Sequence, residues 1–365
     1  MSNIKVNICG IEFKNPVMPA AGPNVRTAEL IMKAVDGGVG GIVTKTISVK
    51  PAMDPRPTIQ SAVCRGLMNC ETWSETSAEE FLDDCKKIKS AGIPIIASIG
   101  YRPEEVEILG PMVEHAISPD AIEFSTHYVG RSTDPIVEIA SRLRAVVSVP
   151  IFMKVSPNFP DIEGLAKAVS PHVDGFIAIN SFGPVLDFDP ETAQPHLGST
   201  YGQGWISGPP ILPLALRIVH QITDVQEKPV IGVGGVSRGV DAIKFFMAGA
   251  SAVQVCSAAI RDGHEVYGRI AREISEWLDE HGYNSIDEIK GLYKKNLESA
   301  ERMPRTVRMS VDADRCIGCG ACVGRCIQGA LSVPDELCKV DLERCIGCGF
   351  CRDFCKFDAL ILKER

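Results

Sequence analysis

Two cysteine motifs carry the most specific chemical signal in the chain. Residues 316–326 read CIGCGACVGRC and residues 345–355 read CIGCGFCRDFC, so both have the spacing Cys-x2-Cys-x2-Cys-x3-Cys. This spacing lets one short loop present three thiolates to an iron–sulfur cube while the fourth reaches a neighbouring cube. Two copies of the motif predict two [4Fe–4S] clusters. The predicted ligands are Cys316, Cys319, Cys322, Cys326, Cys345, Cys348, Cys351 and Cys355.

Structural zinc and disulfide bonds are the alternative uses of such cysteines. Zinc sites seldom take three cysteines at successive two-residue gaps. Proline commonly follows the fourth cysteine of the iron–sulfur motif, but Ile327 and Lys356 stand there in this chain. Neither position supplies a ligand, so the prediction of iron–sulfur clusters is unchanged. The remaining cysteines are Cys9, Cys64, Cys70, Cys85, Cys256 and Cys338, scattered as reduced cytosolic thiols are.

Length, charge and composition limit the remaining possibilities. A chain of 365 residues exceeds the size at which one hydrophobic core usually stops growing, which predicts one large domain and a small one. The net charge of −8 argues against nucleic acid as a partner, because phosphate binding needs a basic face. No apolar stretch resembles a secretion signal or approaches the roughly 18 residues of a membrane span. We therefore expect a cytoplasmic protein that does not bind membranes.

Short runs rich in Val and Ile alternate with amphipathic segments through most of the chain. Eight runs predict strands, at 16–22, 41–47, 93–100, 121–126, 150–156, 175–181, 229–236 and 252–258. Helices are predicted at 27–36, 77–90, 103–117, 134–147, 161–169, 210–222, 238–248 and 262–281. Eight strands alternating with helices predict an α/β fold, a (β/α)8 TIM barrel. Two doubly wound half-sheets would also use eight strands, but the residues at the strand ends favour the barrel.

The predicted organisation has three parts. Residues 1–284 form the barrel, which opens with a β-hairpin at 3–13, and residues 309–365 form a ferredoxin-like domain with both clusters. Residues 285–308 are charged and helix-forming, which predicts a connector, or alternatively a partner-binding helix. Two excursions, 48–75 and 182–208, would leave the carboxyl-terminal rim of the barrel, where active sites lie. We expect them to form the lid and wall of a pocket.

Polar and small residues follow five of the predicted strands. A phosphate beside the last two strands would be held by backbone N–H groups, as is common in barrels. Residues 232–235 read GVGG but lack the third glycine and the acidic residue of a dinucleotide site, so the phosphate of a mononucleotide flavin fits better. The residues at the strand ends are Lys45, Thr46, Lys154, Asn180, Ser181, Gly234, Gly235, Cys256 and Ser257.

Several of these segments resemble the flavin barrel of the dihydroorotate dehydrogenases. They are 19–22 (PAAG), 43–46 (VTKT), 66–69 (GLMN), 152–158 (FMKVSPN), 178–181 (AINS), 207–208 (SG), 234–235 (GG) and 253–257 (VQVCS). The order of barrel, helix and two-cluster module more closely resembles the C-terminal part of dihydropyrimidine dehydrogenase, including its bacterial two-subunit form. The resemblance implies FMN as a third cofactor. It also implies an FAD- and NAD(P)H-binding electron-transfer subunit or a ferredoxin as partner, in a homodimer or hetero-oligomer.

The resemblance also implies which residues hold the flavin. A lysine near the N1–C2 edge of the ring would stabilise the anionic reduced flavin by charge pairing. The alternatives are lysines that extend from the rim into solvent and glycines that form ordinary turns. The implied FMN-binding residues are Ala20, Ala21, Gly22, Lys45, Thr46, Lys154, Asn180, Gly208, Gly234, Gly235, Cys256 and Ser257, and the implied substrate-binding residues are Asn69, Ser125, Asn180 and Ser181.

The loop after the fourth strand departs from the family. The family reads Asn-Leu-Ser-Cys-Pro there, and its cysteine protonates the pyrimidine ring opposite the flavin, whereas residues 125–129 of this chain read STHYV. Tyr128 stands at the position of the acid and is the first candidate to deliver a proton, with His127 as the second. Alternatively, Tyr128 fills the space of the missing cysteine while His127 faces solvent or core.

Three functions remain open from the sequence. The first is an oxidoreductase that moves a hydride between FMN and a polarised C=C or CH–CH unit of a uracil- or thymine-like ring, with electrons passing through both clusters. The second is a similar enzyme for a non-pyrimidine substrate, suggested by the altered loop. The third is an electron-transfer subunit of a flavoprotein complex. The substrate, the direction of reaction and the oligomeric state stay undetermined.

Overall fold

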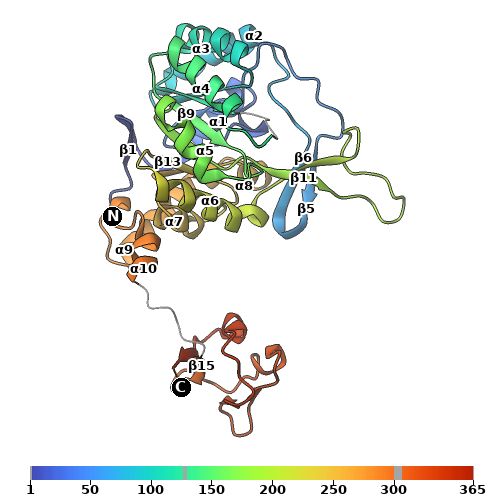
Figure 1. The fold of residues 1–365 in the computed structure, drawn as a ribbon, viewed down its shortest axis with the longest axis vertical. Coiled ribbons are helices and arrows are strands. Elements are labelled where there is room, and N and C mark those ends of the chain that lie inside the picture. Colours follow the sequence, from blue (N-terminus) through green and yellow to red (C-terminus); the bar gives the residue numbers. More distant parts are fainter. Residues whose placement is uncertain (1, 126–129, 300–305, 365) are drawn as a thin grey trace. The chain divides into compact units, whose positions relative to one another are not determined.

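The computed structural model describes residues 2–125, 130–299 and 306–364 (Figure 1). The chain forms two compact units, Met1–Glu298 and Ser299–Arg365. In the described part of the chain, no helix has the length and apolar character that crossing a bilayer would require.

The first unit is built around eight parallel strands. They pair in the order β3-β14-β13-β10-β9-β8-β7-β4, so that strands consecutive in this set are neighbours. At the junction of the first and last strands, the Gly40 amide donates a hydrogen bond to the Val17 carbonyl at 2.8 Å. The predicted TIM barrel is confirmed. Its strands are β3 (Val17–Pro19), β4 (Ile42–Val43), β7 (Ile95–Ile99), β8 (Ala121–Ser125), β9 (Ile151–Val155), β10 (Gly175–Ala178), β13 (Val230–Val233) and β14 (Ala252–Val255).

Helices follow the strands, and their first residues explain where they begin. The side chains of Thr27, Ser77 and Asp161 each accept a hydrogen bond from a backbone N–H of the first turn, which stabilises a helix start. The α-helices of the unit are α1 (Ala28–Asp36), α2 (Ala78–Cys85), α3 (Pro103–Ile117), α4 (Asp134–Val146), α5 (Ile162–Val169), α6 (Leu212–Val225), α7 (Gly239–Met247), α8 (Ser257–Asp262), α9 (Val266–Glu280) and α10 (Leu292–Ser299). Short 3-10 segments are η1 (Pro23–Val25), η2 (Val63–Arg65), η3 (Lys86–Ala91), η4 (Ser170–His172), η5 (Pro209–Ile211) and η6 (Ile286–Glu288).

The predicted hairpin closes one end of the barrel. Strands β1 (Val6–Ile8) and β2 (Ile11–Phe13) are antiparallel and joined by Cys9 and Gly10, both at positive φ. Ile8 and Phe13 are buried in the apolar cluster that fills the barrel, beside the first residues of β8 and β14. The hairpin therefore covers the amino ends of the strands and leaves the carboxyl ends for a site.

The two excursions form one additional sheet. Strands β5 (Ile59–Ala62) and β6 (Gly66–Asn69) come from the first excursion, and β11 (Phe182–Leu186) and β12 (Gln203–Ser207) from the second. They pair antiparallel in the order β11-β12-β6-β5, with Trp205 opposite Asn69. Strands β5, β6 and β11 of this sheet are labelled close together in Figure 1. The sequence analysis placed both excursions at the same rim but did not predict that they pair.

The first part of the predicted connector belongs to the barrel unit. Ile286 and Ile289 are buried in the same apolar cluster as the barrel helices. The boundary between the two units falls after Glu298, and residues 300–305 lie outside the described part.

The second unit consists of short elements around the cysteine motifs. Strand β15 (Arg308–Val311) pairs antiparallel with β18 (Leu360–Lys363), and β16 (Leu331–Ser332) pairs antiparallel with β17 (Lys339–Val340). Two 3-10 turns, η7 (Val323–Arg325) and η8 (Phe350–Phe354), lie inside the motifs.

Candidate functional site

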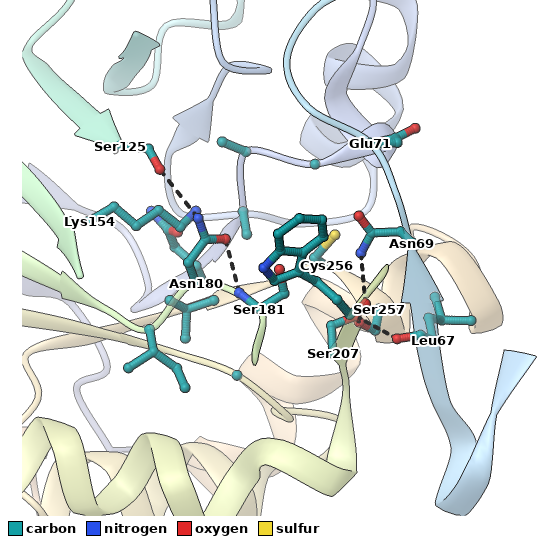
Figure 2. Close-up of a pocket in the computed structure, with 18 of the residues that line it drawn as sticks. Leu67, Asn69, Glu71, Ser125, Lys154, Asn180, Ser181, Ser207, Cys256 and Ser257 are labelled. Carbon is teal, nitrogen blue, oxygen red and sulfur yellow. Dashed lines mark hydrogen bonds between the residues drawn. The ribbon is translucent and has the colours of Figure 1, made fainter. Parts of the chain in front are cut away.

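A cavity of about 510 Å³ opens at the carboxyl ends of the barrel strands. This volume is in the range of small-molecule and cofactor sites. Figure 2 shows Ser125, Lys154 and Asn180 on one side of the view and Asn69 and Glu71 on the other. All described residues predicted to bind FMN or substrate line this one cavity. They are Ala20, Ala21, Gly22, Lys45, Thr46, Asn69, Ser125, Lys154, Asn180, Ser181, Gly208, Gly234, Gly235, Cys256 and Ser257.

The alternation of side chains along the strands produces a polar layer inside the barrel. Ala121, Phe152 and Ala252 point into the apolar cluster that fills the barrel. Because side chains two residues apart share a face of a strand, Glu123, Lys154 and Gln254 point to the same interior, one layer closer to the cavity. All three are buried. The barrel is thus apolar at its base and charged below the site.

Lys154 is held by a buried carboxylate. Its Nζ lies 3.6 Å from Glu123 Oε1, and the side chains of Lys154 and Glu123 are 6% and 0% exposed. Gln254 Nε2 donates to the other carboxylate oxygen of Glu123 at 2.9 Å. The buried charge of Glu123 is tolerated because Lys154 pairs with it and Gln254 donates to its Oε2, while its Oε1 has no hydrogen-bond partner among the described residues. Lys154 therefore presents a positive charge at a fixed place in the wall of the cavity.

Lys45 is paired with a residue that the sequence analysis missed. Its Nζ lies 2.9 Å from Glu71 Oε2, and the two side chains are 7% and 14% exposed. Glu71 follows strand β6 by two residues, so the position of the carboxylate depends on how the excursion folds against the barrel. Glu71 belongs to none of the motifs in the sequence. Its place two residues after Asn69, a predicted substrate-binding residue, could have indicated that it lies at the site.

An unpartnered acceptor also lines the cavity. Within the described residues, Gln254 Oε1 is buried and has no hydrogen-bond partner. An acceptor left in this state costs about 1–3 kcal/mol, so a ligand that supplies an N–H group there would be favoured. The isoalloxazine ring of a flavin carries such an N–H group.

The end of the cavity next to strands β13 and β14 is lined by glycines and hydroxyls. Gly208, Gly234 and Gly235 have φ values of 84°, 123° and 86°, which favour glycine. Ser207 Oγ and Ser257 Oγ lie 2.8 Å apart (Figure 2). Exposed backbone and hydroxyl groups of this kind suit a phosphate.

Cys256 is a protonated thiol rather than a nucleophile. Burial raises the pKa of the Cys256 thiol to about 11, and its Sγ donates to Asn24 Oδ1 at 3.1 Å. Gly22 is required beside it, because an added Cβ at Gly22 would lie 2.4 Å from Cys256 Sγ. Cys256 therefore shapes the floor of the cavity.

Amides and aromatic rings line the part of the cavity between the barrel and the additional sheet. Asn180 Nδ2 donates to Ser125 Oγ at 3.3 Å, and Asn180 Oδ1 accepts from the Ser181 amide at 2.9 Å (Figure 2). Asn69 Nδ2 donates to the Trp205 carbonyl at 3.3 Å. The sequence analysis did not single out the aromatic lining residues. They are Trp73, Tyr101 and Trp205.

The proposed acids His127 and Tyr128 lie outside the described residues. Their roles stay predictions. Ser125, the last described residue before them, is 4% exposed and reaches the cavity from the end of β8. The described chain therefore reaches the wall of the site at the residue before this segment.

The residues of the cavity fit FMN. The volume, the unpartnered Gln254 acceptor, the fixed charge of Lys154 and the glycine-lined end agree with a flat ring that carries N–H and carbonyl groups and a phosphate tail. Lys45 and Lys154 would lie near the ring, and Gly234, Gly235 and Ser257 near the phosphate.

The cysteine motifs of the second unit come together across the repeat. Cys316, Cys319 and Cys322 of the first motif line one small cavity with Cys355, the fourth cysteine of the second motif. In the described residues, no three His, Cys, Asp or Glu side chains converge on a single ion. Three cysteines of one motif and the fourth cysteine of the other are the ligands that one cube takes in two-cluster ferredoxins.

Backbone N–H groups also point at the cysteine sulfurs. Four such bonds, of 3.2–3.4 Å, reach the first and fourth cysteines of each motif. They stabilise the thiolate form that metal binding requires. The accepting residues are Cys316, Cys326, Cys345 and Cys355.

Comparison with known proteins gives family matches for both units. Residues 3–278 match the model described as dihydroorotate dehydrogenase, and residues 309–332 and 338–361 each match the 4Fe-4S binding domain. These matches together span most of the chain.

Similar proteins include catalytic subunits of dihydroorotate dehydrogenase B (NAD(+)). The chain is 34% identical over 299 residues to that of Methanothermobacter thermautotrophicus, which covers 79% of the chain and 98% of the relative. It is 33% identical over 303 residues to that of Pyrococcus furiosus, covering 80% and 99%. For Methanocaldococcus jannaschii the identity is 31% over 304 residues, covering 79% and 97%. Roughly a fifth of the chain thus extends beyond each relative.

Proposed function

Because the chain belongs to the dihydroorotate dehydrogenase family and also carries two 4Fe-4S domains, we propose that it moves a hydride between FMN and an uncharged, uracil-like ring. Its cofactors are FMN and two [4Fe–4S] clusters, and it is an oxidoreductase that acts on CH–CH groups. The clusters pass electrons one at a time, which connects the flavin to a one-electron partner.

The pairing of charges in the cavity carries the substrate proposal. Lys45 and Lys154 are the cations among the described lining residues, and each lies within ion-pair distance of a carboxylate, Glu71 or Glu123. A substrate with its own carboxylate, such as dihydroorotate, would find neither lysine unpaired and would lie near Glu71. Charges of like sign in a poorly solvated site repel strongly. The site therefore favours an uncharged ring.

The polar groups of the cavity match those of a cyclic amide. The Glu71 carboxylate accepts hydrogen bonds, as the ring N–H of uracil requires, and the Asn69 and Asn180 amides can both donate and accept. Trp73 and Trp205 supply flat apolar surfaces for a planar ring. A site with several fixed polar partners rejects analogues that leave any of them unpaired.

The residues of the chain position the reactants and handle the proton. FMN, when bound, supplies or accepts the hydride. Lys154, held by Glu123, would place a positive charge near the ring of the bound cofactor, and so would Lys45, which pairs with Glu71. We propose that Tyr128 delivers the proton to the neighbouring substrate carbon, because it stands at the position of the family acid, with His127 as the second candidate. A positioned acid of this kind typically accelerates a reaction by about 10²–10⁴-fold.

The partner follows from the cluster unit. The relatives are named as catalytic subunits, a term that implies at least one other subunit in their complexes. This chain has the two-cluster unit fused to its barrel, so its partner needs only to exchange single electrons with a cluster. We propose an FAD- and NAD(P)H-binding subunit or a ferredoxin, in a hetero-oligomer or beside a homodimer.

A substrate panel tests this function. Anaerobically prepared protein with FMN and both clusters is mixed with reduced viologen and either uracil, thymine or orotate, and viologen oxidation is followed. We expect oxidation with uracil or thymine and at least tenfold less with orotate. Faster turnover of orotate would contradict the uncharged-ring proposal.

A second candidate is a reductase for a non-pyrimidine substrate. Ser125 stands where the family has asparagine, and it interacts with Asn180, so one of the amide partners of a pyrimidine is replaced by a shorter hydroxyl. No response to pyrimidines together with activity on another conjugated acid or ring would favour this candidate. Flavin that is reduced only by a partner protein would instead favour an electron-transfer subunit.

A further inference from the structure

The cluster unit is an internal repeat with one chemical difference next to its sulfurs. The two 4Fe-4S domain matches begin at Met309 and at Cys338. The Met309 amide donates to Cys345 Sγ at 3.4 Å, and the Cys338 amide donates to Cys316 Sγ at the same distance. Met309 and Cys338 therefore hold equivalent places, each beside the first cysteine of the opposite motif.

The side chains at these equivalent places differ in what they can donate. Met309 is a thioether and has no hydrogen to donate, whereas Cys338 has an S–H group. Both are buried, at 2% and 4% exposure, so neither side chain exchanges its contacts for water. The repeat is thus asymmetric at a position in contact with the predicted cluster ligands.

The Cys338 thiol lies beside a ligand of one cube. Its Sγ is 3.6 Å from Cys322 Sγ, within the distance of a hydrogen bond between sulfurs. It also lines the small cavity that Cys316, Cys322 and Cys355 share. Cys322 in its ligand form is a thiolate and can only accept, so the hydrogen of the pair belongs to Cys338. Cys338 thus gives two hydrogen bonds, from its N–H and its S–H, to two ligands of the same cube.

We propose that Cys338 is a positioning residue that makes the two cubes electronically unequal. Its S–H bond to Cys322 raises the reduction potential of the cube held by Cys316, Cys319, Cys322 and Cys355 above that of the other cube. Reduction adds negative charge to a cube, and hydrogen bonds to its sulfurs stabilise that charge. An electron that enters the unit then resides preferentially on the first cube, whatever the substrate of the barrel is.

The test measures the two potentials directly. Full-length protein with both clusters is titrated anaerobically with dithionite at set potentials, and the reduced cubes are followed by electron paramagnetic resonance. The Cys338→Met variant copies the equivalent residue of the repeat. We expect one of the two reduction steps to move to more negative potential while the other stays in place, and Cys338→Ser, which keeps a donor, to move it less.

The reciprocal variant provides an independent measurement. Met309→Cys introduces a thiol beside the other cube, and we expect the reduction step that Cys338→Met leaves unchanged to move to more positive potential. Cys85→Ala is the matched control, since Cys85 is a buried cysteine of helix α2 in the barrel unit and should alter neither step.

Two results would overturn the proposal. If both steps are unchanged in Cys338→Met, the thiol does not tune the cube. If Cys338→Ser and Cys338→Met both lose about half of the iron, Cys338 is itself a ligand. Neither readout uses a substrate, so an error in the proposed reaction leaves this test intact.

Discussion

The two units of the chain assemble their functional residues in opposite ways. The cluster unit takes its eight predicted ligands from two stretches, 316–326 and 345–355, whereas the barrel site gathers residues from Ala20 to Ser257. The barrel has an extensive apolar core, while the buried cluster of the second unit consists of Met309, Cys322, Leu331, Cys338, Cys351 and Leu360. Three of these six are cysteines, and two of the cysteines are predicted ligands. The comparison indicates that packing organises the first unit and metal ligation organises the second.

Removal of iron is the strongest test of this comparison. A unit this small rarely folds on apolar packing alone, and metal binding then supplies folding free energy. We expect removal of both clusters by an oxidant and a chelator to abolish protection from hydrogen exchange throughout residues 306–364. The barrel strands and bound FMN in the same sample serve as the control and should be unchanged. Retained protection of the cluster unit would mean that its packing is sufficient without metal.

Breaking the buried ion pair tests the organisation of the barrel. Lys154→Met leaves Glu123 buried and unpaired, which should cost about 3–5 kcal/mol of unfolding free energy. The double variant with Glu123→Gln should recover most of that loss, because the uncompensated charge is removed. All three tryptophans lie in the barrel unit, so their fluorescence during denaturant unfolding reports on this unit alone.

The exposed pair of Lys33 and Glu29 is the matched control for this variant. Its side chains are 54% and 78% exposed, and pairs that are so exposed to solvent contribute little to stability. A loss in Lys33→Met as large as that in Lys154→Met would show that burial of the pair is not the cause.

Substitution of Tyr128 tests which residue supplies the proton. If the hydroxyl of Tyr128 delivers the proton, Tyr128→Phe should lower turnover by about 10²-fold or more while FMN content stays the same. Tyr201→Phe is the control, because Tyr201 is 80% exposed on the second excursion. An unchanged rate in Tyr128→Phe would remove Tyr128 from the mechanism and direct attention to His127.

The smallest expected effect is a change of selectivity at Glu71. Glu71→Gln removes the carboxylate that pairs with Lys45 and repels anions, so the ratio of orotate to uracil turnover should rise by about tenfold, equivalent to roughly 1.4 kcal/mol. Glu75→Gln changes an exposed carboxylate, paired with Arg56 at 2.7 Å, and should leave the ratio unaltered. A constant ratio in Glu71→Gln would show that another group rejects the anion.

Local patterns were sufficient for much of the molecule. The cysteine spacing depends on residues within eleven positions, and the alternation of strands and helices depends on side-chain periodicity within each segment. Both kinds of signal are short-range. They led to the barrel fold and the two clusters. The resemblance to the flavin barrel implied FMN and several of the residues that the structure brings into one cavity.

The charges that decide what the cavity can bind are set by contacts between distant segments. Glu123 and Gln254 are 131 residues apart and meet only because β8 and β14 face each other inside the closed barrel. Asn69 and Trp205 are 136 residues apart and meet only because the two excursions form one sheet. Glu71 and Lys45 are 26 residues apart and meet because the first excursion folds against the barrel.

The sequence by itself determined the elements, their order and the thiolate loops, because each depends on neighbouring residues. Only the tertiary structure decided that both site lysines are paired with carboxylates, and that the Cys338 thiol lies beside a predicted cluster ligand while the thioether of Met309 holds the equivalent place. Those relations arise from strand registers and loop packing, which no local pattern of residues encodes.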